Sequence, residues 1–293
     1  MKNLIKLAGV SAVVLLAACD DDTETLVYQT SCTVEEKLTI TANGNPLCDF
    51  ENQDFCAVVN VVAPDYTGSD LQIINDGLVS TGLFPSDQSD RIVSAYGQNF
   101  YRIGRGTIST INRYGNDDSL QEHYMDGGFD GYYLRGKTNP YNIEFVSESE
   151  AYLPLYAGST IQQLNLLSAN QSCFAESSKA IDLSAYNGSD NSPDAFSVKA
   201  LGDKLYVFMQ RLNTTSWPYV KEGSYMAIYN KTDFNLEIDT GKGKDGLKGI
   251  PLPAQNPIAV DYHPDVGFLV AAASNYNDGT ATDGGIIRLN PLT

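Results

Sequence analysis

The chain has 293 residues, and its strongly acidic composition narrows the range of functions before any motif is considered. It contains 36 Asp and Glu against 19 Lys and Arg, a formal net charge of −17 at pH 7. Such a surface repels nucleic-acid phosphates, which binding proteins attract with Lys and Arg. We therefore expect no nucleic-acid partner. The length suffices for one large domain or two smaller ones.

Residues 1–18, MKNLIKLAGVSAVVLLAA, have the features of a secretory signal peptide. Lys2 and Lys6 flank the polar start, and the apolar run that follows is shorter than the roughly 20 residues of a membrane-spanning helix. The segment LAAC at 16–19 resembles the lipobox of bacterial lipoproteins. The resemblance implies that Cys19 becomes the acylated first residue of the mature chain. The alternative is an ordinary signal peptide with an incidental cysteine.

The predicted anchor places the protein in the bacterial cell envelope. Several acyl chains together anchor firmly, because each buried methylene contributes about 0.8 kcal/mol. DDD at 20–22 follows Cys19 directly. In enterobacterial lipoproteins, an aspartate there resembles an inner-membrane retention signal, whereas in other bacteria an acidic stretch accompanies export to the surface. We favour the outer membrane or cell surface, with the periplasmic face of the inner membrane as the alternative.

Residues 19–84 are predicted to form an acidic tether and a disulfide-containing segment. Four cysteines remain after acylation, and an even number in an exported chain indicates two disulfides with three possible pairings. Zinc binding is the alternative, although no Cys-x-x-Cys pair occurs. The apolar stretches at 57–62 and 71–74 are candidate closing strands for the repeat array that follows. The four cysteines are Cys32, Cys48, Cys56 and Cys173.

A motif recurs four times within residues 85–293. Each copy begins with glycine, runs through apolar positions and ends on asparagine. Successive asparagines lie 53, 65 and 60 residues apart, which is long enough for a four-stranded sheet and a surface loop. The copies are GTISTIN at 106–112, GSTIQQLN at 158–165, GSYMAIYN at 223–230 and GGIIRLN at 284–290.

Two further strands are predicted before each copy of this motif. Short runs of β-branched and aromatic residues are bounded by Gly, Pro, Asn, Asp and Ser, as strands are. In each repeat an apolar anchor is followed, eight to ten residues later, by an aromatic residue. The anchors are Ile92, Ile143, Phe196 and Val260, and the aromatic residues are Tyr101, Tyr152, Tyr206 and Phe268.

The segment AYLPLYAGSTIQQLN at 151–165 resembles the YVTN-type β-propeller repeat. LPL at 153–155 stands where that repeat has V-T-N, and Asn165 replaces the usual Asp. The resemblance implies an all-β fold, a β-propeller of four-stranded blades over 85–293, preceded by the cysteine-rich segment. It implies no particular activity. Four blades are recognisable where the family usually has seven or eight, so closure of the ring is left open. A β-sandwich is the alternative fold, but it would not repeat this motif.

No known catalytic motif is present, and we predict no catalytic residue. His123 and His263 are assigned to loops, and the patterns of serine hydrolases, haem attachment, zinc proteases and P-loops do not occur. The acidic loops at 116–118, 186–194 and 274–285 gather the oxygen ligands that calcium prefers. Solvated turns explain these loops better, because none has EF-hand spacing. Calcium is the one cofactor considered, and its candidate ligands are Asp278 and Asp283.

Two pairs of residues are candidates for partner binding. Arg102 and Arg105 bracket a turn, where they either meet an anionic partner or pair with local carboxylates, the second being favoured. Trp217 and Tyr219 lie in the insertion NTTSWPYVKEGS, and loop aromatics often anchor partners. The alternative is that this loop folds over a blade edge.

The leading functional hypothesis is a membrane-anchored, exported β-propeller lipoprotein that acts as a binding or scaffolding module for an envelope or surface protein. The first alternative is a lyase or hydrolase that uses carboxylates in the central channel. The second is a subunit of a larger envelope assembly.

Overall fold

The computed structural model describes the chain in segments, and the statements below concern those segments. They include most of the last three repeats and less of the region before residue 139. The described residues are 38–42, 45–46, 56–75, 78–80, 88–97, 99–106, 110–114, 120–122, 131–133, 139–166, 176–215, 219–234, 237–274 and 284–291.

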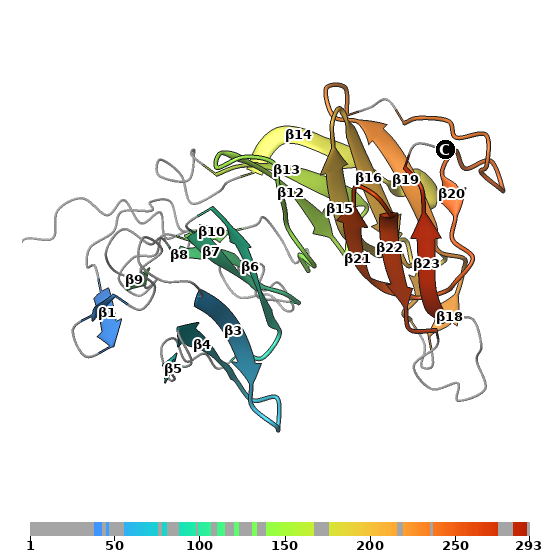
Figure 1. The fold of residues 1–293 in the computed structure, drawn as a ribbon. Coiled ribbons are helices and arrows are strands. Elements are labelled where there is room, and N and C mark those ends of the chain that lie inside the picture. The colour runs from blue at the N-terminus through green and yellow to red at the C-terminus, as the bar shows by residue number, and fades with distance from the viewer. Residues whose placement is uncertain are drawn as a thin grey trace, which may run out of the picture.

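The chain is an all-β protein built from five successive antiparallel sheets, and within each sheet the strands lie side by side in chain order (Figure 1). We number these sheets first to fifth. The first contains β3 (Cys56–Val62), β4 (Ser69–Asn75) and β5 (Leu78–Ser80); the second contains β6 (Arg91–Tyr96), β7 (Asn99–Gly104), β8 (Thr110–Tyr114) and β10 (Gly131–Tyr133); the third contains β11 (Glu144–Phe145), β12 (Glu150–Leu155), β13 (Thr160–Asn165) and β14 (Glu176–Asp182).

The fourth sheet carries an inserted hairpin between its second and third strands. A single 3₁₀ turn precedes this sheet, and a small separate ladder forms nearer the N-terminus. The fourth sheet contains β15 (Ala195–Leu201), β16 (Lys204–Met209), β19 (Tyr225–Asn230) and β20 (Ile250–Pro251); the fifth contains β21 (Pro257–His263), β22 (Gly267–Ala272) and β23 (Gly285–Leu289); the hairpin is β17 (Leu212–Asn213) with β18 (Val220–Lys221); the separate ladder is β1 (Leu38–Ala42), β2 (Asn45–Pro46) and β9 (Leu120–Glu122); the 3₁₀ turn is Ser184–Tyr186.

The predicted third strands are confirmed in all four repeats, and the anchors Ile92, Phe196 and Val260 lie on first strands, whereas Ile143 comes directly before β11. The four glycine-to-asparagine motifs form β8, β13, β19 and β23, which are the third strands of the second to fifth sheets. Gly106 and Gly223 have φ of 56° and 91°, a region that glycine enters without a steric penalty. These two glycines therefore permit the turn before the third strand.

From the second sheet to the fifth, each of the three junctions between consecutive sheets is filled by an apolar cluster. The aromatic residue predicted for each repeat lies on a second strand and is at most 3% exposed. Burying such a side chain contributes about 1.5–3 kcal/mol. The second–third junction contains Tyr101, Ile103, Ile143 and Leu153; the third–fourth contains Tyr152, Ile161, Val198 and Val207; the fourth–fifth contains Phe196, Phe208, Phe268 and Val270.

The strands predicted at 57–62 and 71–74 exist, but they do not complete the last sheet. β3 and β4 pair with each other, with Val59 opposite Gln72. Together with β5 they make the first sheet, which packs beside the second through β3 and β6. The predicted closing strands are therefore an additional sheet at the start of the array.

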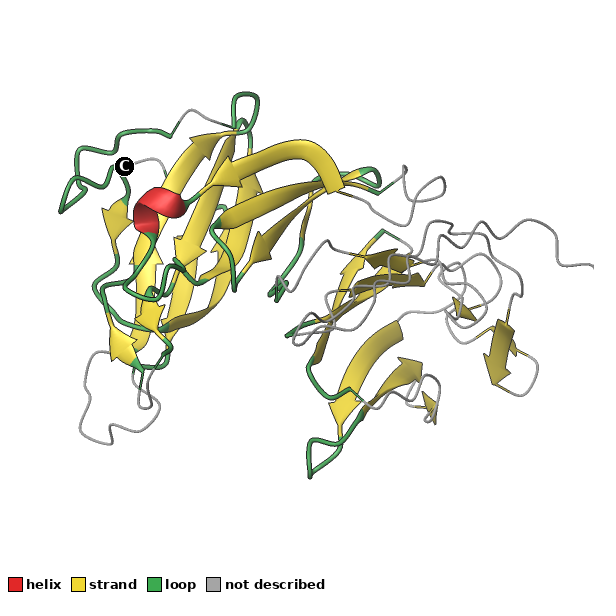
Figure 2. Cartoon of the chain, turned by 180° about the vertical axis from the view of Figure 1, so that it is seen from behind, coloured by secondary structure: helices red, strands yellow, loops and turns green. Residues whose placement is uncertain are grey.

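The first strands of neighbouring sheets form the inner edge of the array. β3 contacts β6, and β15 contacts both β11 and β21. Figures 1 and 2, which view the molecule from opposite sides, place the first and fifth sheets at opposite ends. Within the described part of the chain, no strand of one pairs with a strand of the other.

The predicted lipid anchor and most of the cysteines lie outside the described residues. This holds for Cys19, Cys32, Cys48 and Cys173, while Cys56 is the first residue of β3. The described part of the chain contains no helix of the length and apolar character that a membrane crossing requires.

Candidate functional site

We call the side of the array on which the first strand of each sheet begins the rim. The backbone carbonyl there accepts a hydrogen bond from the residue after the second strand: Tyr156 N donates to Asn139 O at 3.0 Å, and Gln210 N to Asp194 O at 3.1 Å. In the fifth sheet, Asn256 has the same role. Asn139, Asp194 and Asn256 have φ of 46°, 51° and 54°, which Asn and Asp tolerate better than most residues. An Asn or Asp at this position therefore starts three of the sheets.

The most elaborate part of this rim is the β17–β18 hairpin. Leu212 pairs with Lys221, and Asn213 with Val220. The hairpin is inserted between β16 and β19, and it carries the sequence that contains Trp217 and Tyr219. Tyr219 is partly buried, and Val220 is 53% exposed. Trp217 lies outside the described residues. Side chains of the loop at 187–194 hold this hairpin in place.

The side chain of Asp194 holds β17, the first strand of the hairpin, in place. Its side chain is 1% exposed, and Oδ2 accepts a hydrogen bond from Leu212 N at 2.7 Å. The pKa of its carboxyl is raised to about 7, chiefly because burial penalises the charged form. The negative charges of Asp190 and Glu222 act in the same direction, whereas the hydrogen bonds from Leu212 and Ser192 oppose the shift.

Asp190 fixes the hairpin further along the same strand. Its Oδ2 accepts hydrogen bonds from Thr214 N at 2.9 Å and Thr214 Oγ1 at 2.8 Å. Its Oδ1 accepts from Ser192 N at 3.2 Å, which also closes the loop itself. The carboxylate thus connects two segments that are 24 residues apart.

Glu222 connects the end of the hairpin to the same loop. Its Oε2 accepts from Ser189 N at 2.8 Å, and its Oε1 accepts from the Ser189 hydroxyl. Ser189 Oγ in turn accepts from Asn213 Nδ2 at 2.8 Å. A Cβ at Gly188 would lie 2.3 Å from Glu222 Oε2, so a glycine at this position leaves the space that the Glu222 carboxylate occupies.

Arg211 completes the base of the hairpin. Its Nε donates to Tyr186 O at 3.0 Å, and its Nη1 donates to the carbonyls of Glu222 and Gly223 at 3.2 and 3.1 Å. The guanidinium lies 5.4 Å from the centre of the Tyr225 ring. We call Asp190, Asp194, Arg211 and Glu222 the hairpin platform. Its contacts hold both hairpin strands in a fixed position.

The two arginines predicted as partner contacts are engaged within the chain. Arg102 is 2% exposed; its Nε donates to Asn60 Oδ1 at 3.1 Å, and its Nη2 to Ser69 Oγ at 2.9 Å. This burial between the first and second sheets corrects the expectation that Arg102 meets a partner.

Arg105 forms an ion pair with a local carboxylate, that of Asp90. Its Nε lies 2.9 Å from Asp90 Oδ1, an ion-pair contact that lacks the geometry of a hydrogen bond. The guanidinium also lies 4.3 Å from the centre of the Tyr141 ring. Arg105 is therefore partly covered by its own chain.

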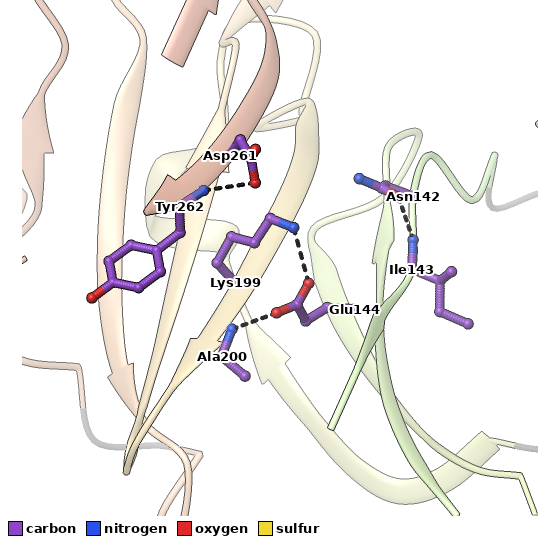
Figure 3. A network of polar contacts seen from close by, with 7 residues as sticks. All are labelled: Asn142, Ile143, Glu144, Lys199, Ala200, Asp261 and Tyr262. Atoms are coloured by element: carbon purple, nitrogen blue, oxygen red, sulfur yellow. Dashed lines mark hydrogen bonds and ion pairs between the residues drawn. The ribbon is translucent and has the colours of Figure 1, made fainter. Parts of the chain in front are cut away.

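The inner edge carries a second polar group, shown in Figure 3. Glu144 on β11 accepts from Ala200 N through Oε1 at 3.0 Å, and its Oε2 pairs with Lys199 Nζ at 3.2 Å. Asp261 on β21 lies nearby, where Oδ1 accepts from Tyr262 N at 2.8 Å. Glu144 and Lys199 thus link the third and fourth sheets with a charged pair.

The remaining predicted residues are not assembled into a site. His263 ends β21 and is exposed, with Nδ1 3.9 Å from Asp265 Oδ2. His123 and the predicted calcium ligands Asp278 and Asp283 lie outside the described residues, so calcium there remains a prediction. Within the segments that the structure describes, no group of three or more His, Cys, Asp or Glu side chains is arranged to hold a metal ion.

Reasoning from the sequence missed the hairpin platform. The sequence places both Asp190 and Asp194 in the acidic loop at 186–194, without indicating which groups they contact. Arg211 and Glu222 flank the hairpin in sequence, but nothing in their spacing indicates the loop they contact. The available signal was the Pro-Asp step before β15, because a carboxylate beside a turn often accepts backbone N–H groups.

Comparisons with known proteins identify neither a family nor an activity for this chain. No family model and no curated protein matches the sequence. Among solved structures, the chain is similar to a streptogramin B lyase, with 14% identity, 82% of this chain and 74% of the other covered, and a TM-score of 0.46. It is also similar to virginiamycin B lyase from Staphylococcus aureus with quinupristin, with 11% identity, 82% of this chain and 75% of the other covered, and a TM-score of 0.48. A third similar structure is apo AztD from Citrobacter koseri, with 10% identity, 80% of this chain and 58% of the other covered, and a TM-score of 0.43.

Proposed function

We propose that this chain is a lipid-anchored, exported protein of the bacterial cell envelope that acts as a binding or scaffolding module. Cys19 carries the acyl anchor at the outer membrane or cell surface, and the disulfides stabilise the segment that follows. The β17–β18 hairpin forms the contact with a protein partner through Trp217 and Tyr219.

The observation that supports this proposal is the hairpin platform. Ordering a contact hairpin on binding costs conformational entropy, and strands that are already held in place lose less of it. Asp194 and Asp190 hold the first strand of the hairpin, while Glu222 and Arg211 hold its end. A short hairpin fixed at both strands is a feature of a preorganised recognition surface.

The test of the contact is crosslinking in native membranes. The chain with both Trp217→Ala and Tyr219→Ala should lose a crosslinked adduct that the wild type forms. The control is Tyr66→Ala, which removes an aromatic residue that is 77% exposed in a turn of the first sheet and should leave the adduct intact. The same adduct in all three chains, at equal melting temperature, would show that the hairpin is not the contact.

The anchor has its own test. Cys19→Ala should move the protein from the membrane pellet to the soluble fraction, because the acyl chains supply most of the membrane affinity. Unchanged sedimentation with membranes would remove the lipid anchor from the proposal and leave the hairpin contact unaffected.

An enzyme that uses carboxylates of the inner edge is the second candidate function. The observation that favours it is the Glu144 carboxylate at the inner edge, which lies 3.2 Å from Lys199 Nζ. Glu144→Gln keeps the shape and an acceptor for Ala200 N. Loss of a lyase or hydrolase activity of the wild type in Glu144→Gln, at unchanged melting temperature, would establish this function, and equal activity in the two chains would remove Glu144 from it.

A further inference from the structure

Three carboxyl groups surround the base of the β17–β18 hairpin, and one of them is buried. Asp194 is 1% exposed, and its Oδ2 accepts a hydrogen bond from Leu212 N at 2.7 Å. Asp190 and Glu222 bring two further carboxylates to the same base through their own contacts between loop and hairpin. None of the ion pairs among the described residues includes Asp194. The buried carboxyl therefore has two acidic neighbours and no paired cation.

The cations of the hairpin do not compensate a charge on Asp194. Arg211 uses its N–H groups on backbone carbonyls, and its guanidinium lies beside the Tyr225 ring. Lys221, opposite Leu212 in the register, is the one charged residue within the two hairpin strands, and it forms no ion pair with Asp194. A buried carboxylate without a partner charge is unfavourable, because burial removes the water that stabilises it. The closed hairpin therefore favours the neutral form of Asp194.

The titration of Asp194 agrees with this geometry. Burial first, and then the charges of Asp190 and Glu222, raise its pKa from 3.8 to about 7, against the opposing hydrogen bonds. An open hairpin, in which water reaches the carboxyl, binds the proton less tightly than the closed one. As the pH rises from about 4 to about 7, the closed form therefore loses stability relative to the open form. The difference in pKa corresponds to a change of up to about a thousand-fold in the opening equilibrium.

The hairpin is able to open without disrupting the fourth sheet. β16 pairs directly with β19 over its whole length, from Lys204 opposite Asn230 to Met209 opposite Tyr225. The hairpin ladder is much shorter, with Leu212 and its neighbour as the paired residues of β17. Small elements with few buried contacts open locally at a lower free energy than the sheets that carry them. Opening of the hairpin is therefore expected to precede unfolding of the sheet.

We propose that Asp194 is a pH-dependent latch of the β17–β18 hairpin, which is closed while the carboxyl is protonated and released when it ionises. At acidic pH, the neutral carboxyl accepts from Leu212 N without burying a charge. At neutral and higher pH, Asp190 and Glu222 repel the ionised carboxylate, and opening of the hairpin hydrates it. The latch itself requires no partner, whereas its regulation of the protein contact rests on the proposed function.

Amide hydrogen exchange of the full chain in mild detergent tests the latch without a partner. The protection factor of the Leu212 amide, corrected for the intrinsic exchange rate, should fall by about a hundred-fold from about pH 5 to about pH 8. At every pH it should be lower than the protection factors of amides in the β16–β19 ladder. The control Asp65→Asn, in an exposed turn of the first sheet, should show the same fall as the wild type.

Two variants identify the group that is responsible. Asp194→Asn keeps an acceptor for Leu212 N but does not ionise, so its Leu212 protection should stay nearly constant with pH. Glu222→Gln keeps an acceptor for Ser189 N and removes one neighbouring charge, so the fall should be complete at a lower pH than in the wild type.

Three results would overturn the latch. The first is a Leu212 protection factor that does not change with pH in the wild type, and the second is the same fall in Asp194→Asn. The third is equal protection of Leu212 and the β16–β19 ladder, because the hairpin would then open only together with the sheet. Absence of a crosslinked partner would contradict the proposed function and leave these exchange results unaffected.

Discussion

The junction between the first and second sheets and the junction between the fourth and fifth are stabilised by different interactions. At the first, the buried Arg102 guanidinium donates to Asn60 and Ser69. At the other, the Phe268 ring packs 4.9 Å from Tyr206 and 5.3 Å from Phe208, centre to centre. An apolar junction gains free energy in proportion to the area it buries, whereas a buried polar group contributes only while its hydrogen bonds are complete. The array therefore combines junctions that differ in how sensitive they are to single changes.

The largest loss of stability is expected from Phe268→Ala. The side chain is fully buried, and removing it leaves a cavity among three aromatic rings, which costs about 4 kcal/mol. Urea unfolding measures this loss. Val220→Ala, at a side chain that is 53% exposed, is the control and should change the free energy of unfolding by about 0.5 kcal/mol or less. A similar loss in both variants would contradict the packing at this junction.

The next effect is a pH dependence that originates at Asp194. The unfolded carboxyl titrates near 3.8 and the folded one near 7, so the folded state binds more protons in this window. The free energy of unfolding should therefore decrease as the pH rises from about 4 to about 7, by on the order of 3 kcal/mol. Asp194→Asn should remove most of that slope, because the amide keeps an acceptor but does not titrate. Asp65→Asn, in an exposed turn, should retain it, and an unchanged slope in Asp194→Asn would assign it to another group.

Arg102→Met tests the polar junction directly. The substitution keeps an unbranched apolar side chain but leaves Asn60 Oδ1 and Ser69 Oγ without this donor, at a cost of about 2 kcal/mol. Arg105→Met is the matched control, since its ion pair with Asp90 is partly exposed and contributes about 1 kcal/mol or less. If the Arg102 variant proved as stable as the Arg105 variant, the polar junction would be stabilised by packing alone.

The smallest effect concerns the hairpin platform. Gly188→Ala should cost about 1 kcal/mol, because the new methyl group displaces the Glu222 carboxylate from Ser189. In the background of Glu222→Ala, the same substitution should cost almost nothing, and this non-additivity in a double-mutant cycle is the measurement. Equal costs in both backgrounds would place the origin of the effect in the backbone of the loop.

The sequence predicted the strands of this fold better than it predicted the contacts among its loops. The repeat motif located β13 and β19 because each strand carries its own apolar positions and turn residues. Arg102 was harder to place. It alternates with Tyr101 and Ile103, so it points to the opposite face of β7, and that face is buried only because a further sheet covers it. The neighbouring sheet, not the local pattern, decides the environment of Arg102.

The hairpin platform could not be predicted from the sequence, for a related reason. Asp190 and Thr214 are 24 residues apart, and Ser189 and Glu222 are 33 apart. Polar side chains in loops have no periodicity that records which distant backbone group they contact. The composition of the loop at 186–194 favoured solvated turns over calcium ligands, and only the folded loop shows that its side chains contact the hairpin.

Because the hairpin is separate from the strand pairing of the fourth sheet, it is a position where the chain can accept an inserted segment. The strands of the fourth sheet are paired with one another independently of residues 214–219, and the hairpin is held by side chains at its base. A foreign peptide inserted between Asn213 and Val220 would start and end on residues that the protein already fixes. The fourth sheet would keep its strand pairing in such an insertion, because β16 pairs directly with β19.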